Sequence, residues 1–295
     1  MDVTEAHIRS YRRALQILRR SPATIVNYEI TLRQLAAHAK TDLEAITRAQ
    51  VEEFLLDSVE QDASATAARK HRNLRAFYNW MVKEEIVDRS PVAGVGAPTV
   101  TETPVPVVPD DVLAKLLKAC AGSDFPERRD TAIIRLWCEA GSPRVSEMVG
   151  LTTDTVDMQH DQVTLHGKGD KVRTIPFGAK TGQALDRYIR IRAKHKDAKL
   201  PNLWLGVKTG RGGLTATGAY RLLERRCEQA GIPRIHPHQL RHTAAHIWKD
   251  RGGSDGDAMA LFGWSSAEMP RRYGKSAEVA RAQRAARRVS QADRL

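Results

Sequence analysis

Side chains that could perform chemistry are concentrated in the last two thirds of the 295-residue chain. In chain order they are Arg144, Lys168, His238, Arg241, Trp264 and Tyr273. Arginine presents a fixed fork of charged donors to anionic oxygens. Lysine and histidine can transfer protons, and a tyrosine oxygen can attack an electrophilic centre. Each residue alone has an ordinary structural explanation, such as a surface ion pair or a core aromatic ring. Their joint order and spacing favour one shared active site.

The order of the surrounding motifs resembles the tyrosine recombinase family, also called the phage integrase family. The family motif HxLRH is matched by residues 238–242, and the hairpin motif GKGxKxR is matched by residues 167–173. A Gly-Trp pair that ends at Trp264 is followed by Tyr273, which is the spacing of the family's third motif. The resemblance covers about residues 110–280.

Two departures from the family pattern concern the first and third motifs. The first motif usually reads TGxRxSEL, but residues 141–148 read GSPRVSEM, so that Pro143 directly precedes Arg144. This change could alter the loop that holds the arginine. Trp264 stands where histidine is commoner, and the resemblance implies packing and an indole N–H donor there, without acid–base chemistry.

The resemblance implies that the substrate is a DNA phosphodiester. Displacement at phosphorus builds charge on the non-bridging oxygens, and two arginine forks can stabilise that charge. We therefore expect Arg144 and Arg241 to bind the phosphate, with a hydrogen bond from Trp264. Glu147, three residues after Arg144, is either an orienting carboxylate or a solvated residue on a helix surface.

The same resemblance implies how the bond is exchanged. Tyr273 is the expected nucleophile, and His238 is the expected base, because a phenol with a pKa near 10 needs help to lose its proton at neutral pH. Lys168 is the candidate acid that protonates the leaving 5′ oxygen. The product would be a 3′-phosphotyrosine, whose formation keeps the bond energy. Neither a metal ion nor ATP is expected as a cofactor.

The elements that must position these residues are mostly helical. Ser21-Pro22 and the capping box at residues 47–50 predict helix starts, and a third helix is expected over about 65–85. In the second half, strands are predicted at 156–158, 162–166 and 172–177, with a hairpin turn at 167–170. Helices are predicted at 110–120, 128–139, 180–196, 215–230, 238–251 and 254–262. The fold class is therefore mostly α with a small antiparallel β-sheet.

Proline marks a boundary between two predicted domains. Residues 90–109 hold five prolines and no basic residue, which indicates a semi-extended linker. We expect a helical core-binding (SAM-like) domain, a linker, an α+β catalytic domain and a tail helix that could be exchanged between protomers. Their ranges are 1–95, 96–109, 110–276 and 277–295. No separate arm-binding domain is expected, because helical periodicity starts near residue 21 or earlier.

The charge of the chain is strongly basic, with a formal net charge of +12 and a pI near 9.8. Residues 1–98 carry a net charge of only +1, so nearly all of the excess lies in the later segment. Such a field attracts nucleic acid or an anionic membrane surface. Residues that could contact DNA are Arg69, Lys70, Arg72, Arg75, Lys171, Arg173 and His242. For the four on the 65–85 helix, a solvated charged face is the equal alternative.

The expected partner is double-stranded DNA, bound by a homotetramer that is a monomer or weak oligomer without it. No apolar run could span a bilayer and no signal peptide is seen, so we expect a cytoplasmic protein without a membrane partner. Cys120, Cys138 and Cys227 are expected to be buried structural thiols. Two other functions stay open: DNA relaxation by a type IB topoisomerase, and regulation by a DNA-binding protein without catalysis.

Overall fold

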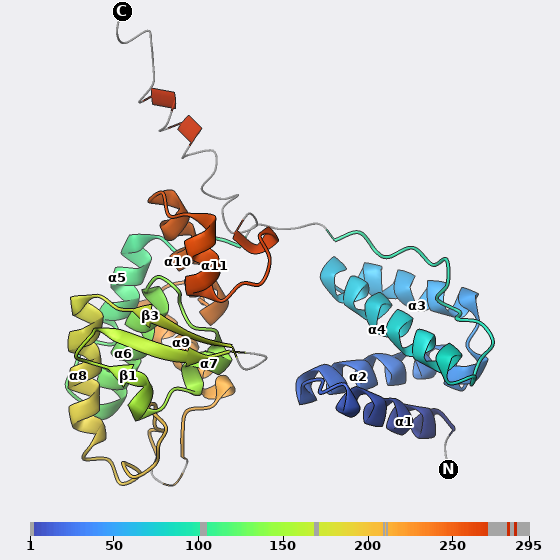
Figure 1. The fold of residues 1–295 in the computed structure, drawn as a ribbon, viewed down its shortest axis with the longest axis horizontal. Coiled ribbons are helices and arrows are strands. Elements are labelled where there is room, and N and C mark those ends of the chain that lie inside the picture. The colour runs from blue at the N-terminus through green and yellow to red at the C-terminus, as the bar shows by residue number, and fades with distance from the viewer. Residues whose placement is uncertain are drawn as a thin grey trace, which may run out of the picture. The chain divides into compact units, whose positions relative to one another are not determined.

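The chain folds into two compact units, which are described separately below. A computed structural model describes residues 3–100, 105–167, 171–208, 210, 212–270, 282–283 and 286–287. Unit 1 comprises Met1–Thr103 and unit 2 comprises Pro104–Leu295 (Figure 1). The expected tail helix at 277–295 falls mostly outside the described residues.

Unit 1 is built only of helices in its described part. They are α1 (Val3–Ile17), α2 (Pro22–Ala39), the short 3-10 helix η1 (Leu43–Ala45), α3 (Arg48–Gln61) and α4 (Ser64–Lys83). The predicted caps are confirmed: Ser21 Oγ accepts a hydrogen bond from the Thr24 N–H, and Thr47 forms a capping box with Gln50. These caps satisfy N–H groups that a helix leaves unpaired at its start.

The core of unit 1 is formed by the apolar faces of these helices. The predicted apolar face of α4, with Leu74, Phe77, Tyr78 and Met81, is fully buried. Tyr78 also donates its hydroxyl hydrogen to the Leu43 carbonyl at 2.9 Å, which satisfies its polar end inside the core. The same face of α4 therefore holds η1 as well as the other helices.

Unit 2 combines helices with one small sheet. Its helices are α5 (Asp110–Lys118), α6 (Phe125–Cys138), α7 (Val145–Val149), η2 (Thr153–Thr155), α8 (Ala179–Arg192), α9 (Ala216–Ala230), α10 (Pro237–Asp250) and α11 (Asp255–Phe262). Its strands are β1 (Val156–Asp157), β2 (Gln162–His166) and β3 (Val172–Pro176). The predicted fold class, mostly α with a small antiparallel sheet, is confirmed.

The sheet has the order β1-β2-β3, and both pairings are antiparallel. Val163 lies opposite Ile175, and both side chains are buried, as is Leu165. Leu165 lies opposite Arg173 on the same face, so the register places one charged side chain among apolar ones. That arginine needs partners inside the protein, and they are found at the site described below.

A buried ion network connects two helices of unit 2. The carboxylate of Asp130 on α6 is completely buried. It accepts hydrogen bonds from Arg129 at 2.8 Å and 3.0 Å, from Arg226 at 2.8 Å and from Arg225 at 3.0 Å. The two last arginines belong to α9, so one carboxylate fixes α9 against α6. A buried charge of this kind is tolerated because it is paired and hydrogen-bonded.

Within the described residues, no helix is both long and apolar enough to cross a membrane. Cys120 and Cys227 are buried and Cys138 is half-buried, and none of the three forms a disulfide in the described structure.

Candidate active site

Arg144 lies at the start of α7, directly after a tight loop. In this loop Gly141 has a φ of +85°, and a Cβ there would lie 2.5 Å from Ile175 Cγ2 and 2.8 Å from the Leu261 carbonyl oxygen. Glycine is therefore required at this position. Pro143 is buried in the same loop, and Arg144 still occupies the N-cap of α7. The side chain of Arg144 keeps 41% of its surface exposed, so it remains accessible to a ligand.

Glu147 is the carboxylate around which the arginines are arranged. Its side chain is buried, and its oxygens accept hydrogen bonds from the Arg144 N–H at 2.7 Å and from Arg144 Nη1 at 2.8 Å. Arg173 donates to both oxygens, each at 2.8 Å. Burial alone would raise the pKa of Glu147, but the bonds and charges of Arg173 and Arg144 outweigh it and lower that pKa to about 2. Of its two sequence interpretations, the structure supports the orienting carboxylate.

Arg173 on β3 points into unit 2, and only 11% of its side-chain surface is exposed. Besides the bidentate bond to Glu147, its Nε donates to the Leu261 carbonyl at 2.8 Å and its Nη2 to the Gly141 carbonyl at 3.4 Å. All of its nitrogens therefore have protein acceptors. The sequence analysis placed Arg173 among the residues that could contact DNA. Its protein acceptors could not be foreseen there, because they lie far from Arg173 along the chain.

Arg241 lies on α10 and is 3% exposed. Its Nη1 donates to the Ser142 carbonyl, and its Nη2 donates to the Phe262 carbonyl. The guanidinium carbon lies 5.3 Å from the centre of the Phe262 ring and 5.9 Å from that of the Trp264 ring. Both distances are within the range of a cation–π interaction. The plane and position of this arginine are therefore fixed before any ligand arrives.

The two expected phosphate-binding arginines meet at the end of α11. Arg144 Nη2 donates to the Gly263 carbonyl at 3.0 Å, while Arg241 donates to the carbonyl of the preceding residue, Phe262. Gly263 has a φ of +60°, and a Cβ there would lie 3.0 Å from Arg173 Nη1. Two arginines that are 97 positions apart in sequence thus bind neighbouring peptide groups.

Trp264 lies beside Arg241, and two histidines lie near Arg241 along α10. Trp264 is 7% exposed and stacks on Phe262, with ring centres 4.8 Å apart and planes 13° apart. His238 is exposed on the first turn of α10, one turn before Arg241, so the two project from one side of the helix. His242 is buried and takes part in the packing of α10.

Two of the expected catalytic residues, Lys168 and Tyr273, lie outside the described residues. The hairpin on which Lys168 is expected is described on both sides of the gap. The Gly167 N–H donates to the Lys171 carbonyl at 2.8 Å, and Lys171 itself is exposed.

The four basic residues expected on the α4 surface of unit 1 have different environments. Arg72 and Arg75 are exposed. Lys70 is half-buried and contacts Asp62 and Ser58, each at 2.9 Å, and Arg69 donates to Asn27 at 3.1 Å. Arg72 and Arg75 therefore have the greater freedom to reach a ligand.

The described residues contain no group of three or more His, Cys, Asp or Glu side chains that could hold a metal ion. Among the described residues, the groups gathered near this site are the guanidinium groups of Arg144 and Arg241, the exposed imidazole of His238 and the indole of Trp264.

Comparison with known proteins identifies the family of the chain. Residues 106–279 match the Phage integrase family, and residues 3–88 match the N-terminal SAM-like domain of phage integrases. Tyrosine recombinase XerC of Corynebacterium efficiens is 34% identical over 263 residues, which cover 87% of this chain and 82% of that protein. XerC of Halalkalibacterium halodurans is 32% identical, covering 77% and 78%. The chain belongs to the phage integrase family, whose enzymes are the tyrosine recombinases.

Solved structures share the fold. The integrase of transposon Tn1549, in complex with transposon right-end DNA, covers 98% of this chain and 99% of its own, with a TM-score of 0.74 and 19% identity. A lambda integrase dimer bound to a core site covers 91% of this chain and 76% of its own, with a TM-score of 0.73 and 18% identity. The helical unit and the mixed unit thus occur together in proteins of distant sequence.

Proposed function

We propose that this site-specific recombinase cleaves and rejoins double-stranded DNA through a covalent link to Tyr273, with Arg144 and Arg241 binding the scissile phosphate. One observation carries the proposal: the two guanidinium groups are bound to consecutive carbonyls, of Phe262 and Gly263, and so face one location. Guanidinium forks suit the non-bridging oxygens of a phosphodiester, whose charge grows as the bond is exchanged.

The arginines have unequal roles in this scheme. Arg241 is buried, so it provides a fixed positive charge beneath the phosphate. Arg144 is more exposed and can close over a non-bridging oxygen. Trp264 donates its indole N–H to the same phosphate and, with Phe262, covers the face of Arg241. Because these donors are positioned in advance, little reorganisation is needed during the reaction.

The exchange of bonds uses three further residues. The Tyr273 oxygen attacks phosphorus, and His238 accepts its proton. The bond to the 5′ oxygen breaks, and Lys168 supplies the proton that this oxygen takes up. The phosphoester remains intact as a 3′-phosphotyrosine, so the reverse attack by a 5′ hydroxyl rejoins the strand without ATP. Each step uses only residues of this chain.

The wider arrangement belongs to the same proposal. Residues 1–95 form the core-binding domain, 96–109 the linker, 110–276 the catalytic domain and 277–295 the tail. The match of residues 3–88 to a SAM-like domain and the division into two units support this assignment. Four protomers exchange strands through a four-way junction. A lambda integrase tetramer bound to a Holliday junction, which shares the fold with a TM-score of 0.71 and 17% identity, supports this step.

A suicide substrate tests the central claim. A pool of nicked, randomised duplexes, from which the leaving fragment diffuses away, is incubated with the protein and resolved on a denaturing gel. We expect a protein–DNA band that is lost in Tyr273→Phe and retained in Tyr220→Phe, a control at an exposed tyrosine of α9. A band of equal intensity in Tyr273→Phe, or no band in the wild type, would overturn the proposal.

A further inference from the structure

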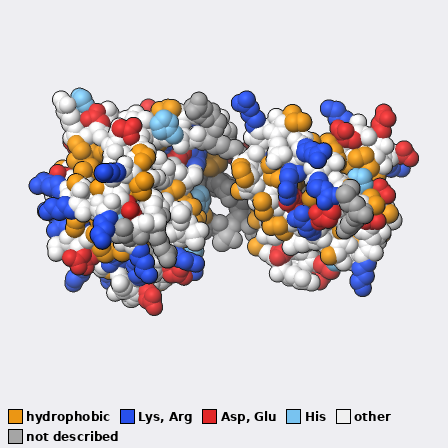
Figure 2. All heavy atoms as spheres, turned by 90° about the horizontal axis from the view of Figure 1, so that it is seen from below, with side chains coloured by type: hydrophobic (Ala, Val, Ile, Leu, Met, Phe, Trp, Pro, Cys, Tyr) orange, Lys and Arg blue, Asp and Glu red, His pale blue; other side chains and the backbone are white. Residues whose placement is uncertain are grey.

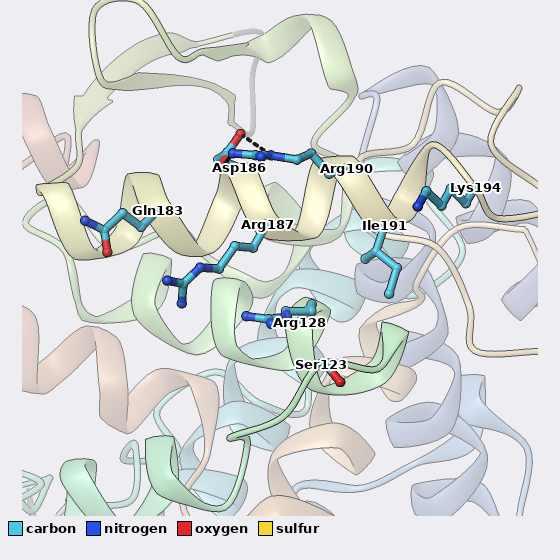
Figure 3. A pocket seen from close by; sticks show the side chains of 8 residues that line it. All are labelled: Ser123, Arg128, Gln183, Asp186, Arg187, Arg190, Ile191 and Lys194. Carbon is cyan, nitrogen blue, oxygen red and sulfur yellow. Dashed lines mark hydrogen bonds and ion pairs between the residues drawn. The ribbon is translucent and has the colours of Figure 1, made fainter.

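A basic groove lies between α6 and α8 of unit 2, and its residues have no part in the site above. It has two adjoining sections of about 490 Å³ and 390 Å³, which share Arg128, Gln183 and Arg187. The cations that line it are Arg128, Arg135, Lys180, Arg187, Arg190 and Lys194. Figure 3 shows Arg187 extending from α8 toward α6, and Arg128 extending from α6 into the same space.

The positive charge of this basic groove is largely uncompensated. Asp186 pairs with Arg190, and its Oδ1 accepts from Arg190 Nε at 3.0 Å. In the described part of the chain, no carboxylate forms an ion pair with any of the other five cations. Uncompensated cations that face one hollow repel one another, so an anionic ligand would stabilise them. Figure 2 shows several Lys and Arg side chains at the left border of unit 2.

The spacing of the cations indicates a long anion. Lys180 and Arg187 are seven residues apart, which is two helical turns, so they lie in one row on α8, and Lys194 follows seven residues later, beyond the end of the helix at Arg192. At a rise of 1.5 Å per residue, Lys180 and Arg187 are about 10 Å apart along the helix. A DNA strand carries one phosphate per 3.4 Å of axis, so these two side chains span about three phosphate spacings, and Lys194 extends the basic lining further. On α6, Arg128 and Arg135 have the same seven-residue spacing.

The composition of the groove argues against a small-molecule site. Pockets for small ligands are lined mainly by apolar and aromatic side chains, with few polar groups. Here the lining is dominated by six cations, and its larger apolar side chains are Ile191 and Leu117. Guanidinium groups in a row are instead typical of contacts to a phosphate backbone.

We propose that the basic groove between α6 and α8 binds the backbone of a second DNA duplex while the active site holds the first. The two sites are well separated: in Figure 1, α8 lies at the left border of unit 2, and α7, which begins after Arg144, lies near the right border. The two sites share no residue, so the groove is assigned to a duplex other than the one held at the active site. The inference rests on the proposed function only in taking DNA as the polyanion.

A two-step capture experiment tests this inference. The full chain is loaded on an immobilised 40-base-pair duplex and washed, and a fluorescent duplex of random sequence is then added at several salt concentrations. The test variant is Arg128→Ala/Arg187→Ala, and Arg187→Glu is a second variant with the same change of charge. Lys115→Ala/Lys118→Ala on α5 removes two charges elsewhere in unit 2 and serves as the matched control.

We expect the wild type and the control to retain the fluorescent duplex. Both groove variants should lose at least tenfold in affinity for it, and the double variant should lower the slope of log K against log salt by roughly 2, since each phosphate contact contributes about 0.9. The inference would be overturned if the groove variants retained the fluorescent duplex as well as the wild type, or if the control variant lost it to the same extent. It would also be overturned if poly-glutamate displaced the fluorescent duplex and excess unlabelled duplex did not. The Tyr273-dependent band should be unchanged, so failure of the proposed function would be seen separately.

Discussion

The contacts of Arg241 require an arginine at this position. Arg241 uses two nitrogens for two carbonyls, of Ser142 and Phe262, and also stacks on two rings. Lysine has the same charge but presents it as a point, without a planar fork. We therefore expect Arg241→Lys to slow formation of the covalent complex by about 10²- to 10³-fold, the usual loss for one transition-state donor. Rates on the suicide substrate measure this, with circular dichroism to verify folding. A loss below threefold would contradict the assigned role.

The low pKa of Glu147 makes a second prediction at this scale. Its folded-state pKa is about 2, below the ordinary value of 4.5. A carboxylate with a depressed pKa contributes stability above about pH 4.5, and this contribution disappears as the pH falls toward 2. Glu147→Gln should therefore lower the free energy of unfolding by about 3 kcal/mol at pH 7, since each pKa unit corresponds to about 1.4 kcal/mol. Denaturant titrations should show this difference narrowing between pH 5 and pH 3. A difference independent of pH would refute the linkage.

At the scale of elements, Arg173 connects β3 to α7 and to the end of α11. It binds Glu147 after the start of α7 and the Leu261 carbonyl near the end of α11. We expect Arg173→Gln to slow cleavage at least tenfold while the salt dependence of DNA binding stays unchanged, because its nitrogens face protein acceptors. Lys171→Gln, an exposed neighbour on the same hairpin, is the matched comparison. If Lys171 contacts a phosphate, the Lys171→Gln variant should lower the slope of log K against log salt by about 1. A reduced slope for Arg173→Gln would restore the DNA-contact interpretation.

The pairing of α6 with α9 depends on Asp130. Removal of one member of a buried ion network leaves the others unpaired and commonly costs about 3–5 kcal/mol. We expect Asp130→Asn to approach that loss in free energy of unfolding, measured by denaturant titration. Asp111→Asn, which breaks an exposed pair with Lys115, should cost less than about 1 kcal/mol. Equal effects of the two substitutions would contradict the structural role of the network.

The sequence predicted elements better than it predicted their contacts. β2 has the predicted bounds, and β3 ends one residue earlier, because alternation and turn residues are local properties. Helix α1, with Ile8, Tyr11 and Leu15 buried, had only a general prediction of helix before residue 21. The partners of Arg173 lie 26 to 88 positions away, and no local pattern specifies such a pairing. Motif order placed Arg144 and Arg241 in one site, but the carbonyls that hold them became known only from the fold.

For the whole molecule, the uneven distribution of charge leads to a prediction about assembly. Unit 2 carries nearly all of the excess positive charge, so protomers without DNA should repel one another through these units. We expect light scattering to give a mass near 32.8 kDa for the protein alone. When a DNA duplex that carries a recognised site is added, the mass should rise to that of four chains plus two duplexes. A stable tetramer without DNA, or a single chain per duplex at saturation, would contradict the proposed assembly.

The peptide groups of Phe262 and Gly263 hold Arg144 and Arg241, and the proposed nucleophile, Tyr273, follows them in the sequence by about ten positions. A movement of these two peptide groups would release Arg144 and Arg241 together. The enzyme could thus be inactive while its DNA surface stays fully open. The backbone at Phe262 and Gly263 would then control activity, and no segment would need to block the substrate.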